Sequence, residues 1–189
     1  MTSFYAPPNP GEIQQTAILR DVELPDVRFR AGQRVEVAFA SWPWLLVLNQ
    51  DCDLLLDRLA REGKPSVEGG NAVKKDKLLR TILLCPAFSE VHVLSGTYVE
   101  DATQWSHKEA PVILENRHER YHVLPAEEPV GEPLVLDFKL ILAVHPEYLQ
   151  RWVDEHPQSV IAVLLPPYRD RLMQRFLNYF GRIALPDEI

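Results

Sequence analysis

Cysteine is scarce in this sequence, because only Cys52 and Cys85 among its 189 residues carry thiols. Two cysteines cannot form the disulfide framework of a small secreted domain, so we expect free thiols or metal ligands in a reducing compartment. No apolar run approaches the roughly 20 residues that cross a bilayer. Residues 1–10 also lack the charged and apolar regions of a signal peptide. The sequence therefore predicts a cytoplasmic protein without membrane contact.

Basic residues are in the minority, with 20 lysines and arginines against 27 aspartates and glutamates and a formal net charge of −7. This balance argues against a protein that coats nucleic acid through its overall charge. Phosphate-cradling glycine loops, serine-hydrolase turns and dinucleotide-binding fingerprints are missing, which excludes kinases, nucleotide-binding GTPases and α/β-hydrolases. The remaining composition, 46% hydrophobic and 25% charged, is typical of one globular domain over residues 1–189.

Short apolar segments separated by turn residues predict a mainly β domain with helices, of the α+β class. The continuous apolar run 44–48 is typical of a strand buried on both faces. Further strands are expected at 17–19, 35–39, 81–85, 122–124, 134–138 and 159–165, with breaks at Pro25, at 31–32 and at Pro86. Strands this short leave open sheet edges, which a small closed barrel removes.

Two other segments have distinct patterns. Apolar residues at 172, 176, 179, 180 and 183 predict a C-terminal amphipathic helix that starts near Pro167. Residues 64–77 contain a proline, two consecutive glycines and four lysines, a composition that predicts a mobile loop.

The sharpest polar motif is Gln50-Asp51-Cys52-Asp53, at the expected change from strand to helix. Cys52 starts an apolar stripe with positions 55, 56 and 59, which predicts an amphipathic helix that ends at Gly63. In the simplest interpretation, Cys52 is a core residue on this stripe, and Asp51 or Asn49 caps the helix. Two flanking aspartates oppose the low thiol pKa that a cysteine nucleophile needs.

A metal site is the alternative interpretation of this motif, because cysteine, aspartate and histidine all bind zinc. Its ligands would be Cys52 and Asp51, joined by Cys85 and His122 from distant parts of the chain. None of these pairs has the close spacing of a zinc ribbon or of a helical zinc motif.

The segment 116–122 is a second polar concentration, with Arg117, Arg120 and His122 among its residues. Its arginines could hold an anion and its histidine could act as acid or base. The other interpretation is a solvated edge strand or hairpin. An ion pair from Arg120 to Asp51 or Asp53 would unite the two polar segments in one cleft.

Five segments resemble a family of small bacterial proteins that carry the Q-D-C-D motif. They are G-E-I at 11–13, V-L-x-Q-D-C-D-L at 47–54, N-x-x-E-R-Y-H at 116–122, L-V-x-D-F-K at 134–139 and R-F-x-x-x-x-x-R-x-A-L-P at 175–186. The resemblance covers most of the chain and implies no particular activity.

The first two segments are also similar to the SH3-like barrel of the MazF and PemK endoribonuclease toxins. In those toxins a G-D-I strand precedes an R-P-x-x-V-L-S/T strand. Here Trp42 replaces the arginine and Asn49 replaces the hydroxyl residue. The resemblance therefore implies a small SH3-like barrel without RNA cleavage.

We consider three functions. The first is a non-catalytic binding or accessory module, without a cofactor, that recognises a protein partner through a polar cleft formed by Gln50, Asp51, Cys52, Asp53, Arg117, Arg120 and His122. The second is a metal-assisted hydrolase or nuclease in which zinc or activated water sits at the Asp-Cys-Asp segment and His122 is the acid or base. The third is an RNA-binding domain that uses the arginines at 169, 171, 175 and 182. The acidic balance favours the first.

Overall fold

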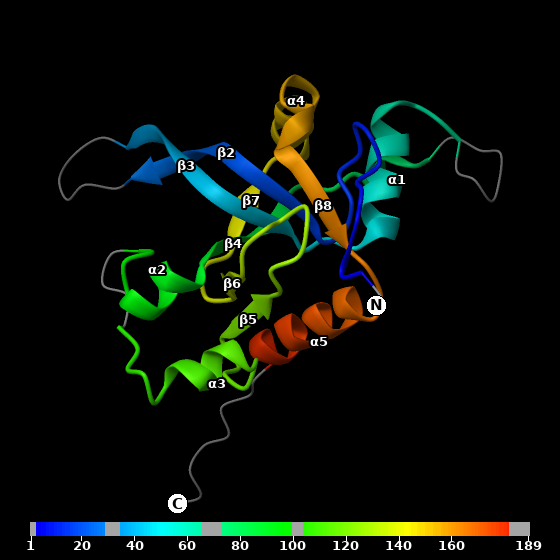
Figure 1. Cartoon of the computed structure of the whole chain (residues 1–189). Coiled ribbons are helices and arrows are strands. Elements are labelled where there is room, and N and C mark those ends of the chain that lie inside the picture. The colour runs from blue at the N-terminus through cyan, green and yellow to red at the C-terminus, as the bar shows by residue number, and fades with distance from the viewer. Residues whose placement is uncertain (1–2, 29–34, 66–72, 100–103, 182–189) are drawn as a thin grey trace, which may run out of the picture.

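The computed structural model describes residues 3–28, 35–65, 73–99 and 104–181. Within these residues, eight strands form one curled antiparallel sheet in the order β1-β8-β2-β3-β4-β6-β5, and β7 pairs with β4 (Figure 1). The strands are β1 (Tyr5–Ala6), β2 (Ala17–Arg28), β3 (Glu36–Val47), β4 (Ile82–Ser89), β5 (Tyr121–Leu124), β6 (Leu134–Asp137), β7 (Leu142–Val144) and β8 (Val160–Leu164). The helices are α1 (Asp51–Arg61), α2 (Glu90–Ser95), α3 (Ala110–Leu114), α4 (Pro146–Glu155) and α5 (Tyr168–Phe180), with short 3-10 turns η1 (Lys75–Lys77) and η2 (Pro157–Ser159). The prediction of a mixed α+β fold is confirmed.

The core lies on both faces of the centre of this sheet. Leu45, Leu46 and Val47 in β3 are all inaccessible to solvent. Because side chains alternate along a strand, Leu46 packs in the core that α5 covers, whereas Leu45 and Val47 pack in the core that α1 and α4 cover. Figure 1 shows α4 and α5 on opposite sides of the strands. The prediction that run 44–48 is buried on both faces is therefore correct for β3.

Two prolines predicted to break strands lie inside them. Pro25 is in β2, opposite Phe39 of β3, and β2 pairs with β8 only through Ala17–Leu19. Pro86 is in β4, between the residues that pair with β7 and those that pair with β6. Each proline therefore has a paired strand on one side only, where a missing N–H is tolerated.

The buried face of α1 differs from the predicted apolar stripe. Leu54 and Asp57 are its buried residues, whereas Cys52 and Leu55 are exposed. Asp57 faces inward because its carboxylate accepts hydrogen bonds from the Leu79 N–H at 2.7 Å and from Arg61 Nε at 2.8 Å. The prediction of Cys52 as a core residue is therefore wrong.

Some predictions fall on parts of the chain outside the described residues. These are the turn at 31–32, half of the predicted loop at 64–77 (residues 66–72) and residues 182–186 of the last motif. Among the residues that are described, none belongs to a helix with the length and apolar character needed to cross a membrane.

Candidate functional site

The Q-D-C-D motif forms the start of α1, with Gln50 as its N-cap residue. Neither Asn49 nor Asp51 caps α1, contrary to the prediction, because no described side chain caps its N-terminus. The side chain of Asn49 instead accepts a hydrogen bond from the Leu83 N–H in β4 at 2.7 Å. Asp51 Oδ1 accepts a hydrogen bond from the Gln15 N–H at 2.7 Å, and Oδ2 lies 3.4 Å from Arg169 Nη1. Asp51 therefore links the N-terminal segment and α5 to the start of α1.

The two cysteines lie in contrasting surroundings. Cys52 is exposed, and its Sγ is 3.6 Å from Gln50 Oε1 and 4.0 Å from the carboxylate of Asp53. Cys85 is buried in β4, with its Sγ 3.5 Å from the carbonyl oxygen of Asp137. Burial, together with the negative charge of Asp137, raises the pKa of Cys85 well above its ordinary value.

The four predicted metal ligands, Cys52, Asp51, Cys85 and His122, do not converge. Within the described ranges, no three histidine, cysteine, aspartate or glutamate side chains are grouped to hold a metal ion. The exposed thiol of Cys52 and the buried thiol of Cys85 belong to different parts of the fold.

Arg120 pairs with Asp137 rather than with Asp51 or Asp53. Its Nε donates to Asp137 Oδ1 at 2.7 Å, and its Nη2 donates to Oδ2 at 2.5 Å. The Tyr98 hydroxyl also donates to Oδ2, at 2.9 Å. Asp137 is fully buried, so this network holds the α2–α3 side of the sheet together, and Arg120 is not available to a cleft at Asp51.

Arg117 and His122 take no part in that network. Arg117 is on the surface, paired with Glu115 at 2.9 Å. His122 is only 6% exposed, and burial followed by the charges of Arg175 and Arg171 lowers its pKa to about 3. Its imidazole is thus neutral across the physiological pH range, which does not suit a general acid or base near pH 7.

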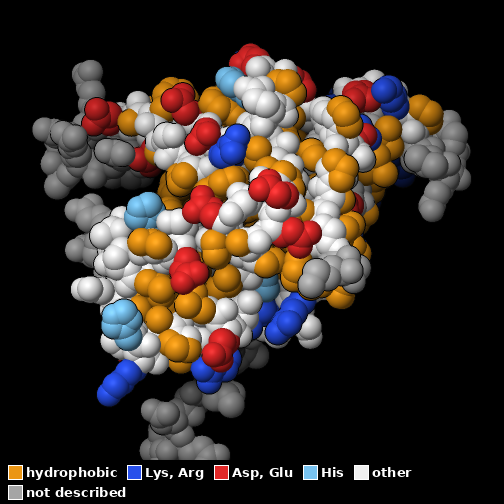
Figure 2. Space-filling view, viewed as in Figure 1, with side chains coloured by type: hydrophobic (Ala, Val, Ile, Leu, Met, Phe, Trp, Pro, Cys, Tyr) orange, Lys and Arg blue, Asp and Glu red, His pale blue; other side chains and the backbone are white. Residues whose placement is uncertain are grey.

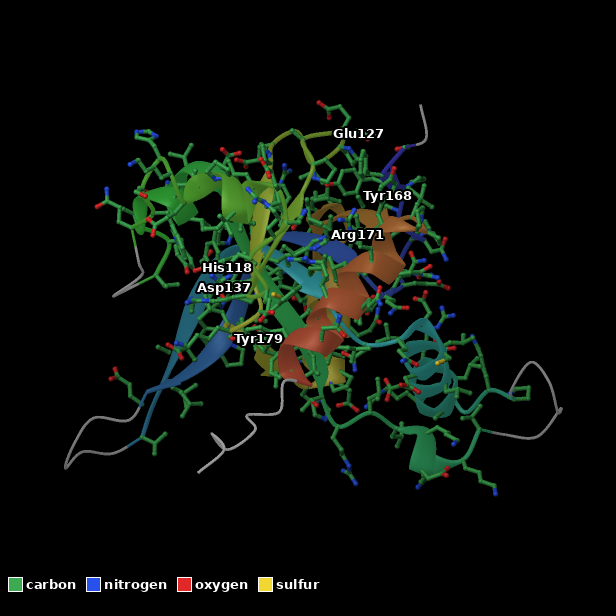
Figure 3. All side chains as sticks on the ribbon, turned by 90° about the horizontal axis from the view of Figure 1, so that it is seen from below. His118, Glu127, Asp137, Tyr168, Arg171 and Tyr179 are labelled. Atoms are coloured by element: carbon green, nitrogen blue, oxygen red, sulfur yellow. The ribbon has the colours of Figure 1, made fainter. Side chains whose placement is uncertain are left out.

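The arginines of α5 contact the two polar segments from different positions on this helix, Arg169 in its first turn and Arg175 near its middle. Arg169 reaches Asp51, whereas Arg175 donates to the carbonyl oxygens of Asn116, His118 and Tyr121 at 2.6–2.8 Å. In Figure 3, Tyr168 and Arg171 lie along one part of α5, and Tyr179 lies toward its other end. Arg169 and Arg175 are therefore structural, which weakens their predicted use as an RNA-binding face.

The surface shown in Figure 2 agrees with this assignment. Acidic and apolar side chains are interspersed over that face, and basic side chains do not form a continuous patch on it. Such a face offers nothing for a phosphate backbone to follow.

A cavity of about 480 Å³ opens beside Asp51. It lies between α1, α4 and the N-terminal segment 9–14. Its floor is apolar, with the buried residues Leu54, Ile82 and Pro146, and Ile13 and the exposed Leu55 complete the apolar lining. Its charged lining consists of Glu12, Asp51, Asp57, Glu62 and Asp154 against Arg58 and Arg61. Five carboxylates against two guanidinium groups make the cavity acidic.

We call this space the α1 cavity. Both arginines in its lining form ion pairs within the protein. Arg58 Nη1 pairs with Glu12 Oε1 at 2.5 Å, and a hydrogen bond from Asn9, followed by this pairing, lowers the pKa of Glu12. Arg61 pairs with Asp57 at 2.8 Å and with Glu147 at 2.6 Å. Glu62 pairs with Lys64, and Asp51 lies 3.4 Å from Arg169. Asp154 on α4, which accepts a hydrogen bond from Gln150, is therefore the lining carboxylate outside the ion pairs of the described residues.

Sequence reasoning missed most of this cavity. Asp51 was a predicted site residue, but Asp154, Gln150 and segment 9–14 were not. Asp57 and Arg61 are four residues apart and pair across one helical turn at 2.8 Å, but this spacing alone does not indicate that the pair faces inward.

The chain matches no protein-family model, no curated protein and no solved structure. The resemblances to the Q-D-C-D proteins and to the MazF and PemK toxins stay predictions. The function must accordingly be inferred from the geometry of the site itself.

Proposed function

We propose that this protein is a non-catalytic binding module whose α1 cavity receives a basic side chain, an arginine for preference, from a protein partner. The observation that carries the proposal is the 480 Å³ cavity at Asp51, which combines an apolar floor with an acidic rim. The proposed setting is a small SH3-like barrel of the Q-D-C-D type in the bacterial cytoplasm.

The lining suits the two parts of an arginine side chain. Its aliphatic stem would lie on Leu54, Leu55 and Ile13. Its guanidinium group would reach the carboxylate of Asp154 and would share that of Asp51 with Arg169, which lies 3.4 Å from it. Planar guanidinium groups pair with carboxylates through two parallel hydrogen bonds, which would give this contact geometric selectivity.

The same lining disfavours two of the alternatives considered for this site. Arg58 and Arg61 hold Glu12 and Asp57 in ion pairs, so these two carboxylates are not free to coordinate a divalent cation. The net acidity of the lining opposes a nucleic-acid phosphate.

The test is a titration of the full-length ¹⁵N-labelled protein with N-acetyl-arginine-methylamide and, separately, with the uncharged citrulline counterpart. The arginine compound should perturb amide signals of residues 9–14, 51–58 and 150–154. The citrulline compound should perturb them at least about tenfold more weakly, because it lacks the charge that the rim recognises. Equal binding of the two compounds, or perturbations elsewhere, would contradict the proposal.

The informative variant combines Asp51→Asn and Asp154→Asn. It removes both negative charges, but each asparagine keeps an oxygen that can accept the hydrogen bond from the Gln15 N–H or from Gln150. This variant should lose the preference for arginine over citrulline. Glu115→Gln, which removes an exposed carboxylate outside the cavity, is the matched control and should keep it. A peptide array with a central arginine or citrulline then extends the measurement to protein segments.

A further inference from the structure

A second cavity, of about 240 Å³, lies between β5 and the first turns of α5. Its walls are largely apolar and include Phe4, Leu124, Leu164 and the ring of Tyr168. It shares no lining residue with the α1 cavity. We name it the β5–α5 cavity and consider it independently of the proposed function.

The polar lining of this cavity is unusual in one respect. His122 is 94% buried, and its Nδ1 has no hydrogen-bond partner in the described residues. A buried polar atom without a partner costs free energy, and native proteins seldom leave one unexplained. The His122 ring is therefore a candidate for contact with something outside the described residues.

Arg171 is the second polar feature, because it brings a cation to an otherwise apolar cavity. It is exposed on α5, and none of the described carboxylates forms an ion pair with it. Figure 3 shows Arg171 next to Tyr168, with Glu127 beyond Tyr168. The carboxylate of Glu127 accepts hydrogen bonds from the Ser3 hydroxyl and the Phe4 N–H.

A second guanidinium group reinforces the positive charge behind the cavity. Arg175 donates to three main-chain carbonyl oxygens, and the charge of Glu119 acts on it. The charges of Arg175 and Arg171 both act on His122. Asn116, which also lines the cavity, uses its side chain on the N–H and carbonyl of Val123 and is structural.

We propose that the β5–α5 cavity binds a carboxylate carried on a small apolar body. The apolar body would lie between Phe4, Leu164 and the ring of Tyr168, and the carboxylate would pair with Arg171 beside the imidazole of His122. One available guanidinium group matches one negative charge, and a guanidinium pairs with a carboxylate through two parallel hydrogen bonds. The small volume limits the apolar body to about the size of a benzene ring or a branched aliphatic group.

Such a carboxylate can come from a free small acid or from the last residue of a peptide. The test uses the full-length ¹⁵N-labelled protein and two pairs of probes. The first pair is benzoate and benzamide, and the second is an acetylated tripeptide ending in valine with a free or an amidated carboxyl terminus. We expect saturable shifts of amides in 121–125 and 164–171 with at least one of the two acids, and at least about tenfold weaker binding of its amide.

Arg171→Gln is the main variant, since Arg171 is exposed and its replacement leaves the core intact. It should weaken binding of the acid at least about tenfold, as expected for loss of a charge-assisted pair. Arg151→Gln, at another exposed helical arginine outside the cavity, is the matched control and should bind like the unaltered protein.

Binding of benzoate alone identifies a free acid as the ligand, and binding of the peptide alone identifies a chain terminus. The proposal is overturned if neither acid binds, if the amides bind as well as the acids, or if Arg171→Gln binds with unchanged affinity. The proposal is also overturned if the acids shift only amide signals of the α1 cavity. That result would not decide the proposed function, which the arginine titration tests separately.

Discussion

Arg120 and Asp137 are joined by two parallel hydrogen bonds, from Nε to Oδ1 at 2.7 Å and from Nη2 to Oδ2 at 2.5 Å. Asp137 is completely buried, whereas the side chain of Arg120 is 25% exposed. The guanidinium group thus covers a carboxylate that has no access to water. The pair joins the chain before β5 to the end of β6, two segments that are neighbours in the sheet.

Replacing Arg120 with methionine should destabilise the protein by about 3–5 kcal/mol, because it leaves a buried charge without its counterion. Urea unfolding followed by circular dichroism measures this loss. Arg117→Met removes an arginine whose pair with Glu115 is more than 60% exposed, and should change stability by no more than about 1 kcal/mol. Similar effects of the two substitutions would contradict the assignment. Adding Asp137→Asn to Arg120→Met should recover part of the loss.

Arg175→Lys should also destabilise the fold, although it preserves the charge. A lysine ammonium is a single point and cannot reach the carbonyl oxygens of Asn116, His118 and Tyr121 together, as the guanidinium does. We expect a loss of about 2 kcal/mol or more, since hydrogen bonds to charged groups are lost. Hydrogen exchange should become faster in residues 116–122 before it does in β3. Arg151→Lys is the control, and equal exchange in both variants would argue against the role of Arg175.

Local sequence patterns sufficed for the strands at the centre of the sheet. The run 44–48 is apolar at every position, and such a run is buried on both faces of a sheet whatever its neighbours are. Pro25 and Pro86 were misjudged because the cost of a proline depends on which side of the strand has a partner. That information lies in the pairing of distant segments and not in the local sequence.

The candidate site was less predictable, for a related reason. The apolar stripe that begins at Cys52 suggested one buried face for α1, but the inward ion pair of Asp57 and Arg61 selects another. Asp57 can be buried because it accepts a hydrogen bond from the Leu79 N–H, which is 22 residues away. Both cavities likewise combine residues from distant segments, such as 9–14 with 150–154.

Protonation of His122 should make stability depend on pH. Burial, with the charges of Arg175 and Arg171, lowers the pKa of this residue to about 3 in the folded protein, against about 6.5 in the unfolded chain. The unfolded state therefore binds more protons between these values. Stability should be fully present above pH of about 6.5 and should fall toward pH of about 3, with a slope of up to about 1.4 kcal/mol per pH unit from this group.

The measurement compares the pH dependence of unfolding in the unaltered protein with that of His122→Gln. Other groups contribute the same background to both proteins, so the difference between the two curves isolates His122. His107→Gln, which removes an exposed histidine, should leave the slope unchanged. Parallel curves for His122→Gln and the unaltered protein would contradict the assignment.

The two thiols should differ strongly in their reaction with iodoacetamide. Cys52 is exposed at the start of α1, whereas Cys85 is inaccessible in β4 and burial raises its pKa. Only the thiolate reacts, so Cys85 is protected both by burial and by its protonation. In the native protein we expect Cys52 to be labelled first, and Cys85 to react at least about a hundredfold more slowly, through opening of the sheet. Mass spectrometry of peptides gives both rates.

Cys52→Ala should leave the native protein almost unlabelled, and Cys85→Ala should label like the unaltered protein. If Cys85 reacts as fast as Cys52 without denaturant, β4 does not lie at the centre of the sheet, and the buried network around Asp137 is lost with it.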